Sequence, residues 1–318
     1  MLYYLRSTTD GHSAAVRDDR KGDAITVMRV GLFMFATSES VHVGKLAKLA
    51  EDAGIESIWV PEHTHIPASR DTAPPLGQAV PNKYGRLFDP LLVLTAAAVS
   101  TDRLLLGTAV TLTACHHPIT LAKQIATVDM LSGGRLMLGV GSGWNREELA
   151  NHGVAFDSRW RRAREHLNAM KTIWEHDEAS FHGEWVHFDR IWSWPKPVQL
   201  PHPPVLYGTI QPSKLVIREA DGWLPLSLAH PGQLRERMVT LRQMAEDAGR
   251  DPDELDITVM CLERSDPDVL IEYADAGATR VVIRPPLDSL ERFRDYLASY
   301  GQLLAPRTLA TIADPVNG

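Results

Sequence analysis

The feature that most constrains this chain is a regular alternation, repeated eight times, between a short apolar run and a longer amphipathic segment. The amphipathic segments place apolar side chains at the three- and four-residue spacing of a helix, as residues 39–55 do. The runs are apolar almost throughout, as expected when both faces of a parallel strand are buried. Eight strand–helix pairs predict an α/β protein of the (β/α)8 TIM-barrel class, with a doubly wound sheet as the alternative.

The boundaries of these elements follow from local signals. Asp89 can cap the second helix with Pro90 at its first position, and the third helix can begin at Pro118 and end at Gly133. The predicted strands are residues 28–35, 57–61, 103–111, 135–141, 203–209, 222–227, 255–261 and 279–286. The predicted helices are residues 39–55, 89–101, 118–134, 159–177, 212–222, 231–249, 266–277 and 288–304.

Two long irregular insertions interrupt this pattern. Residues 62–88 follow the second strand, and residues 181–204, rich in Trp and Pro, precede the fifth. Loops of this length are functional or mobile. Residues 1–27 have little apolar periodicity and much charge, so we expect a disordered N-terminal extension before one barrel domain over residues 28–318.

Composition excludes some classes of function. A net charge of −7 without a dense run of Lys and Arg argues against nucleic acid as a partner. No apolar run approaches the length of a membrane span, so we expect no membrane partner. Two cysteines form no disulfide framework and indicate free thiols in the cytoplasm. We expect a homodimer that acts on a small-molecule substrate.

A glycine-rich stretch, Gly139 to Gly143, ends the fourth strand. A dinucleotide-binding fingerprint would follow the first strand and would need a third glycine where this chain has Trp144. Two interpretations remain. The glycines let a flat ring or a phosphate approach the backbone, or they only form a tight strand-to-helix turn.

The ends of the other strands hold further candidates, because barrel active sites lie at the carboxyl ends of the strands. This set of small residues, hydroxyls, one His and one Arg suits a flat, largely neutral ligand with an anionic tail. Its members are Glu62, His63, Gly107, Thr108, Ala109, Val110, Tyr207, Gly208, Thr209, Ser227 and Arg284.

Four segments make the pattern more specific: GIESIWVPEHTHIP, LAKQIATVDMLSGGRLMLGVGSGWNREE, FHGEW with WSWPKPVQLPHPPVL, and DGWLP. Together they resemble the luciferase-like monooxygenase family, most closely its F420-dependent oxidoreductases, over residues 28–286. Members of that family are TIM barrels that hold FMN or the deazaflavin coenzyme F420 at the carboxyl face.

The resemblance implies roles for several residues. Glu62 and His63 match an acid–His pair near the deazaflavin ring, and Ala109-Val110 matches a non-prolyl cis peptide behind it. Ser142 and Gly143 match residues on the pyrimidine side of the ring. The residues that match the sites for the tail and phosphate are Tyr207, Gly208, Thr209 and Ser227.

The chain also departs from the family. F420-dependent sugar-phosphate dehydrogenases of the family carry a catalytic Glu where this chain has Trp144, so their acid chemistry does not transfer. Many relatives have a glycine in place of Thr209, which leaves the phosphate contacts and the choice of cofactor open. Because Trp144 replaces an acid, a cofactor-binding protein without catalysis is one alternative.

Individual residues have competing interpretations. His63 is the candidate proton donor, or it only orients the cofactor. His63 and His65 form a His-x-His, typical of metal-dependent barrel hydrolases, but other strand ends offer no further His or Asp, so we expect no metal. Arg284 pairs with an anionic tail or forms a surface ion pair. The substrate pocket is predicted to include Trp144, His116 and Trp192, although Trp192 could instead clamp the second insertion onto the barrel.

The sequence therefore predicts an F420-dependent or flavin-dependent oxidoreductase. It would transfer hydride between the bound ring and a small organic substrate. An FMNH2- and O2-dependent monooxygenase is the alternative within the same fold, and a metal-dependent hydrolase is the alternative from another class.

Overall fold

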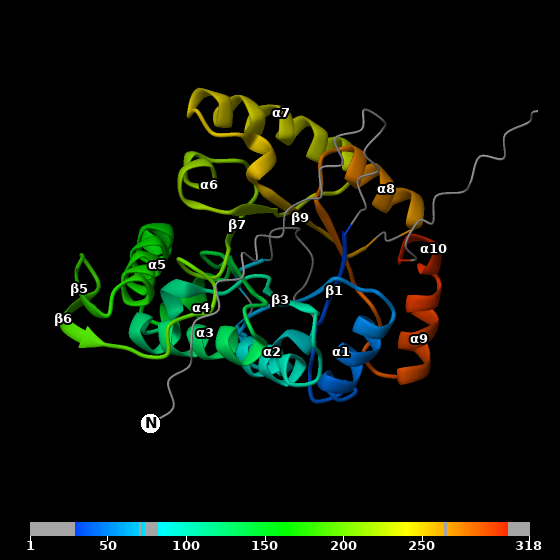
Figure 1. The fold of residues 1–318 in the computed structure, drawn as a ribbon, viewed down its shortest axis with the longest axis horizontal. Helices are drawn as coiled ribbons and strands as arrows, with labels where there is room; N and C mark the ends of the chain where they lie inside the picture. Colours follow the sequence, from blue (N-terminus) through cyan, green and yellow to red (C-terminus); the bar gives the residue numbers. More distant parts are fainter. Residues whose placement is uncertain (1–28, 70, 74–81, 264–265, 305–318) are drawn as a thin grey trace, which may run out of the picture.

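The structure is a computed structural model that describes residues 29–69, 71–73, 82–263 and 266–304. The extension predicted over residues 1–27 lies outside these residues. Parallel strands close into a barrel in the order β1-β10-β9-β8-β7-β4-β3-β2, which confirms the predicted fold class (Figure 1). The barrel strands are β1 (Arg29–Phe33), β2 (Ser57–Val60), β3 (Leu105–Thr108), β4 (Leu136–Val140), β7 (Val205–Thr209), β8 (Gly222–Pro225), β9 (Asp256–Cys261) and β10 (Arg280–Ile283).

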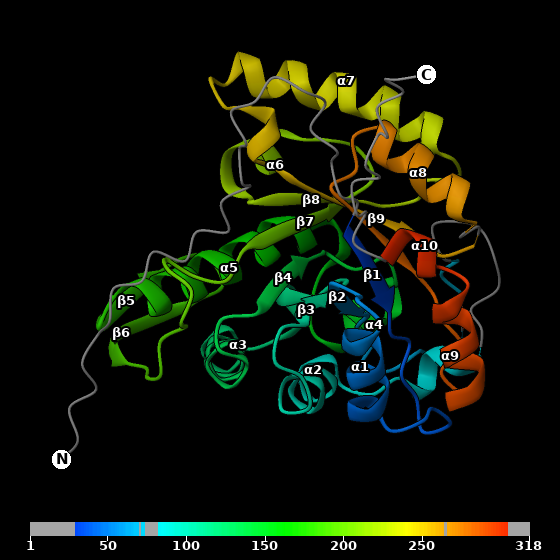
Figure 2. The same cartoon turned by 45° about the vertical axis from the view of Figure 1, so that its right-hand side comes forward.

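Helices surround this barrel on the outside, as Figure 2 shows. The longer ones are α1 (Val43–Asp52), α2 (Pro90–Ala98), α3 (Pro118–Ser132), α5 (Arg159–Glu175), α7 (Pro231–Asp247), α8 (Pro267–Asp275) and α9 (Leu290–Ala298). The shorter ones are α4 (Arg146–Asn151), α6 (Lys214–Glu219) and α10 (Gly301–Leu304). Single 3-10 turns are η1 (Asn82–Arg86), η2 (Thr113–Cys115), η3 (Phe156–Ser158) and η4 (Pro252–Glu254).

The predicted helix boundaries are confirmed where local signals were strongest. The Asp89 carboxylate accepts the Leu92 N–H at 3.0 Å and caps α2. Pro118 is the first residue of α3, and Gly133 ends it in a left-handed conformation at φ 68°. These signals act within one helical turn, which is why they can be found in the sequence.

Strand alternation divides the apolar side chains into two layers. One set faces the helices, and the other fills the barrel with residues that include Phe33, Met137, Leu206, Leu224 and Val282. Trp59 lies fully buried at the centre of the inner set. A Cβ on Gly107 would lie 2.4 Å from the Trp59 ring, so a glycine is needed there.

The second insertion is more regular than predicted. Within it, β5 (Glu178–His182) and β6 (His187–Trp192) form a two-stranded antiparallel sheet that packs on α5, at the left of Figure 1. The Glu165 carboxylate of α5 accepts the backbone N–H groups of residues 184–186 in the connecting turn. The prediction of an irregular segment is wrong because this anchor is a side chain of the preceding helix, which no turn or strand signal within the segment itself indicates.

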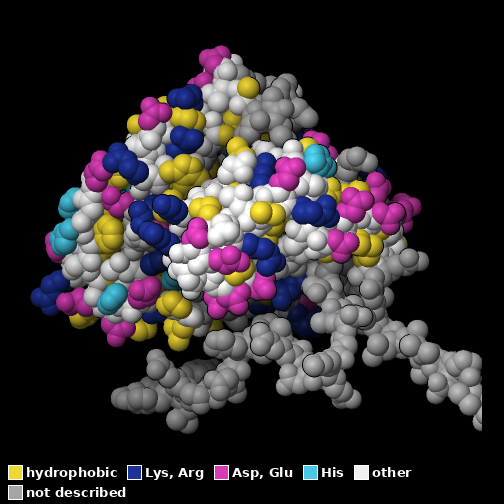
Figure 3. All heavy atoms as spheres, turned by 90° about the horizontal axis from the view of Figure 1, so that it is seen from above, with side chains coloured by type: hydrophobic (Ala, Val, Ile, Leu, Met, Phe, Trp, Pro, Cys, Tyr) yellow, Lys and Arg dark blue, Asp and Glu magenta, His cyan; other side chains and the backbone are white. Residues whose placement is uncertain are grey.

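The surface gives no sign of a strongly charged face in the view of Figure 3. Acidic and basic side chains are interspersed there with apolar ones. Across the described part of the chain, no helix combines the length and apolar character that a membrane crossing requires.

Candidate active site

The neighbours Glu62 and His63 follow β2 and hydrogen-bond to different partners, which is consistent with the alternation of side chains along an extended chain. His63 Nδ1 lies 2.7 Å from Glu148 Oε2, and the two side chains are only 8% and 2% exposed. The imidazole contacts the rings of Tyr84 and Trp144, with 5.5 Å between ring centroids in each case. His63 is therefore packed against aromatic rings and bonded to one buried carboxylate.

Glu148 was not among the residues predicted for the site. It lies in the first turn of α4, where the Asn145 side chain accepts its backbone N–H at 2.9 Å. An Asn-x-x-Glu spacing is typical of a capping box, in which the Glu side chain turns back to the first residue of the helix. Here the carboxylate bonds to His63, and its other oxygen, Oε1, is buried without a partner. The Asn-x-x-Glu spacing indicates where the helix starts, but it does not indicate that Glu148 bonds to His63.

Further side-chain bonds join α4 to the loop after β2. The Thr64 hydroxyl lies 2.7 Å from His152 Nε2, and the Asn151 amide donates to His65 Nε2 at 2.9 Å. His63 and His65 thus bond to different partners. The described residues contain no group of three or more His, Cys, Asp or Glu side chains arranged to hold a metal ion. The hydrolase alternative gains no support.

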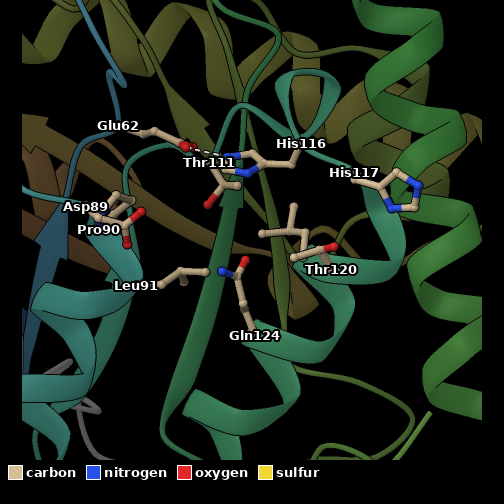
Figure 4. Close-up of a pocket in the computed structure, with 10 residues that line it drawn as sticks. Glu62, Asp89, Pro90, Leu91, Thr111, His116, His117, Thr120 and Gln124 are labelled. Atoms are coloured by element: carbon tan, nitrogen blue, oxygen red, sulfur yellow. Dashed lines mark hydrogen bonds and ion pairs between the residues drawn. The ribbon is translucent and has the colours of Figure 1, made fainter. Parts of the chain in front are cut away.

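Glu62 and His63, which match an acid–His pair of the family, bond to different partners. One Glu62 oxygen accepts the Leu112 N–H at 2.7 Å, and the other lies 2.5 Å from His116 Nε2. Glu62 and His116 line a cavity of about 210 Å³ at the N-terminal ends of α2 and α3, together with Asp89 and other residues (Figure 4). The structure places neither residue against the His63 ring.

Electrostatics differ around this second pair. Burial opposes charging of His116, but the hydrogen bond and charge of Glu62, with Asp89 nearby, outweigh it and raise the pKa of His116. Burial, followed by the charges of Glu62 and Glu148, raises the pKa of the Cys115 thiol to about 12. Cys115 is therefore a protonated thiol at neutral pH, with two carboxylates near it.

The predicted cis peptide is present between Ala109 and Val110. β3 ends at Thr108, before this bulge, although the predicted strand continued to residue 111. A Cβ on Gly141 would lie 2.2 Å from Val110 Cγ2, and one on Gly208 would lie 2.8 Å from Val110 Cγ1. Two glycines at the mouth therefore make room for the bulge itself, which favours close packing as the reason for at least part of the glycine-rich stretch.

The remaining strand ends contribute unequally. Ser142 is buried, and Gly143 has φ +79°, as a turn requires. The Tyr207 ring belongs to the layer between barrel and helices and meets Trp160 edge-on at 6.2 Å. Because the side chain packs in that layer, only the backbone of Tyr207 can contact a ligand at the mouth of the barrel. The Thr209 hydroxyl accepts the Trp223 indole N–H at 2.9 Å.

Two cations lie near Tyr84. The Arg284 guanidinium donates to the Leu262 carbonyl at 3.0 Å. Burial, and then the charge of Arg284, lowers the pKa of Lys83 in η1. Lys83 also lies over the Phe35 ring, 4.9 Å from its centroid. Lys83 was not predicted from the sequence, because its place beside Arg284 depends on how the first insertion folds back.

Trp192 is not brought to the mouth of the barrel, which corrects its assignment to the substrate pocket. It lies on β6, is 78% exposed and donates its indole N–H to Glu178 at 3.2 Å. Nor does it act as a buried clamp. By contrast, Ser227, at the end of β8, adopts a left-handed φ of 57°, uncommon outside glycine.

Residues 28–307 match the luciferase-like monooxygenase family. An uncharacterized protein of Mycobacterium tuberculosis (strain H37Rv) is 41% identical over 286 residues, which cover 88% of this chain and 98% of the relative. An F420-dependent glucose-6-phosphate dehydrogenase of Nakamurella multipartita is 30% identical over 230 residues, 68% of this chain and 61% of the relative. Monooxygenase RslO1 from Streptomyces bottropensis, at 20% identity, superposes with a TM-score of 0.72 over 87% of this chain and 98% of that one.

Proposed function

Since the chain belongs to the luciferase-like monooxygenase family, whose relatives use F420 or FMN, we propose that it is an F420-dependent oxidoreductase. Coenzyme F420 would bind at the carboxyl-terminal mouth of the barrel and transfer hydride to or from a small organic substrate. The relative named for F420 aligns with 68% of this chain at 30% identity, and a relative named for FMNH2 aligns with 52% at 34% identity. The longer alignment is the support for F420.

The residues present fit such a group. The aromatic side chains of Tyr84 and Trp144, both in contact with the imidazole of His63, can stack against a flat ring. Lys83 and Arg284 supply positive charge for an anionic tail. The residues proposed to hold the cofactor are His63, Ala109, Val110, Ser142, Gly143, the Tyr207 backbone, Gly208, Thr209, Ser227 and Arg284.

The observation that carries the proposal is the setting of His63. When bound, the cofactor supplies hydride chemistry that no protein side chain provides. The chain's own part is to place a proton donor beside it and to exclude water. The carboxylate of Glu148 holds Nδ1 of His63, which leaves Nε2 as the nitrogen that can give a proton to the substrate.

Fluorescence titration with F420 and with FMN tests the choice of cofactor. We expect tighter binding of F420, and reduction of a substrate by reduced F420 in an anaerobic screen. If FMN binds at least as tightly and reduced FMN with O2 supports turnover, the protein is instead the monooxygenase of the same fold.

We also propose that the protein is a cytoplasmic homodimer. The two cysteines of the chain, Cys115 and Cys261, are not joined by a disulfide, as a reducing compartment favours. α2 and α3 pack side by side and expose large apolar side chains, Leu92 at 71% and Val99 at 69% among them. Exposed apolar patches of this kind mark interfaces. Sedimentation should show a dimer, and Leu92→Glu with Val99→Glu should give a monomer.

A further inference from the structure

We propose that Glu148 is the positioning residue that orients the imidazole of His63 and favours its protonated form. The proposal rests on the proposed function, in which His63 gives a proton to the substrate. It assigns a task to a buried acid on α4, outside the strand ends where barrel sites are usually sought.

The contacts of His63 support this assignment. The Tyr84 ring is tilted against the imidazole, and the Trp144 ring meets it edge-on. Glu148 Oε2 lies 2.7 Å from His63 Nδ1. A carboxylate that accepts from Nδ1–H selects the tautomer and keeps Nε2 for the substrate. Its charge also favours the imidazolium over the neutral ring.

Several other titratable groups lie around His63. Tyr84 faces the ring from η1, and burial raises the pKa of its phenol, so it is neutral at pH 7. Arg284 and Lys83 lie close to Tyr84 and are cationic. Glu62, the next residue along the chain, is bonded to His116 instead. Among these groups, Glu148 is the anion in contact with His63.

The proton balance is simple for a carbonyl substrate. Bound reduced cofactor would supply a hydride, which carries two electrons, to the carbonyl carbon as the C=O π bond breaks. The oxygen takes the proton from His63 Nε2 and becomes a hydroxyl group. The His63 ring would end neutral, with its proton on Nδ1 still donated to Glu148.

The alternative is a purely structural role, in which Glu148 only holds α4 against the loop after β2. Other bonds already make that tie, because Thr64 bonds to His152, and His65 bonds to Asn151. A change of Glu148 that removes the charge and keeps an acceptor should therefore leave the helix in place. The protonation of His63 then distinguishes the two roles.

The experiment uses Glu148→Gln, with Glu147→Gln as the matched control. Glu147 is the preceding residue of α4, and its carboxylate bonds to Thr72, away from His63. Histidine side-chain NMR of the full chain without cofactor, with His63→Asn to identify the resonance, follows the His63 midpoint against pH. We expect Glu148→Gln to lower this midpoint by at least about one pH unit, because an opposite charge is lost, and Glu147→Gln to leave it unchanged.

A second variant guards against a folding defect. Glu148→Asp keeps the charge but shortens the reach, so its midpoint should lie between those of Glu148→Gln and the wild type. An unchanged midpoint in Glu148→Gln would overturn the proposal.

The same variants are then compared in single-turnover reduction of acetone, a simple ketone whose carbonyl carbon accepts hydride, by bound reduced F420. Above the wild-type midpoint, the rate of Glu148→Gln should be about tenfold lower for each pH unit by which the substitution lowers that midpoint. A lowered midpoint with no F420 binding in the wild type would refute the proposed function and leave the positioning role of Glu148 standing. Turnover by the wild type with equal rates in Glu148→Gln would refute the positioning role.

Discussion

Two histidine–carboxylate pairs lie just after the end of β2. They have the same chemical groups but differ in their surroundings, their exposure and their other hydrogen bonds. His63 pairs with Glu148 among aromatic rings, and both side chains are nearly inaccessible. Glu62 pairs with His116 beside a cavity formed with the ends of α2 and α3, and the His116 side chain is 23% exposed. The side-chain carboxylate of Glu148 makes one hydrogen bond, to His63. The Glu62 carboxylate bonds to His116 and also accepts the backbone N–H of Leu112, in the loop before α3.

The difference shows that adjacency in sequence is a poor guide to partnership at a strand end. Successive side chains of an extended chain point in opposite directions, so neighbours meet different surroundings. The role that we propose for His63 and its partner is proton transfer at the mouth. Glu62 and its partner are suited to holding a loop.

The largest expected effect tests which histidine takes part in the reaction. His63→Asn should slow single-turnover hydride transfer at saturating reduced cofactor by about 10²–10⁴-fold, as loss of a general acid does. His116→Asn, the matched change in the other pair, should leave the rate within about threefold, well below that range. Equal losses in the two variants would contradict the division of roles.

The next effect concerns stability. Glu62→Ala should destabilise the protein by about 1–3 kcal/mol, because the buried N–H of Leu112 loses its acceptor and His116 its partner. Glu148→Gln keeps an acceptor for His63 and should cost less. Urea denaturation of both variants checks the order, and the reverse order would show that the pair at the mouth is the structural one.

A smaller effect is the pH dependence of the Glu62–His116 pair. The folded state raises the pKa of His116 above its usual 6.5. Its contribution to stability is therefore fully present below about pH 6.5 and is lost as the pH rises through the folded-state pKa. The difference in Tm between wild type and His116→Asn should shrink between pH 6 and pH 9. A constant difference would mean that the charge of His116 adds nothing.

The smallest effect should come from the exposed tryptophan of the hairpin. Trp192→Ala should change stability by less than about 0.5 kcal/mol, as surface substitutions do, and should not alter cofactor affinity. Trp144→Ala, which removes a ring packed against His63, should weaken cofactor binding. Calorimetric titration of both variants with the cofactor checks this. If Trp192→Ala also bound the cofactor more weakly, Trp192 would belong to the site.

Much of the fold could be predicted because its signals are local. The caps at Asp89 and Gly133 act within a turn, and the apolar runs identify the strands of a closed parallel barrel. The cis peptide before Val110 was predicted by family resemblance and is present. The β5–β6 hairpin was missed, because its turn is held by Glu165 from another element.

The sequence by itself determined the barrel, the start of α2, both ends of α3 and which strand ends meet at one face, because periodicity and caps depend on neighbours along the chain. Only the tertiary structure decided which side chains work together there. Glu148 lies 85 residues from His63, and His116 lies 54 residues from Glu62. Their pairing depends on how the loops and α4 pack over the barrel mouth, and no local pattern in the sequence records contacts made across that distance.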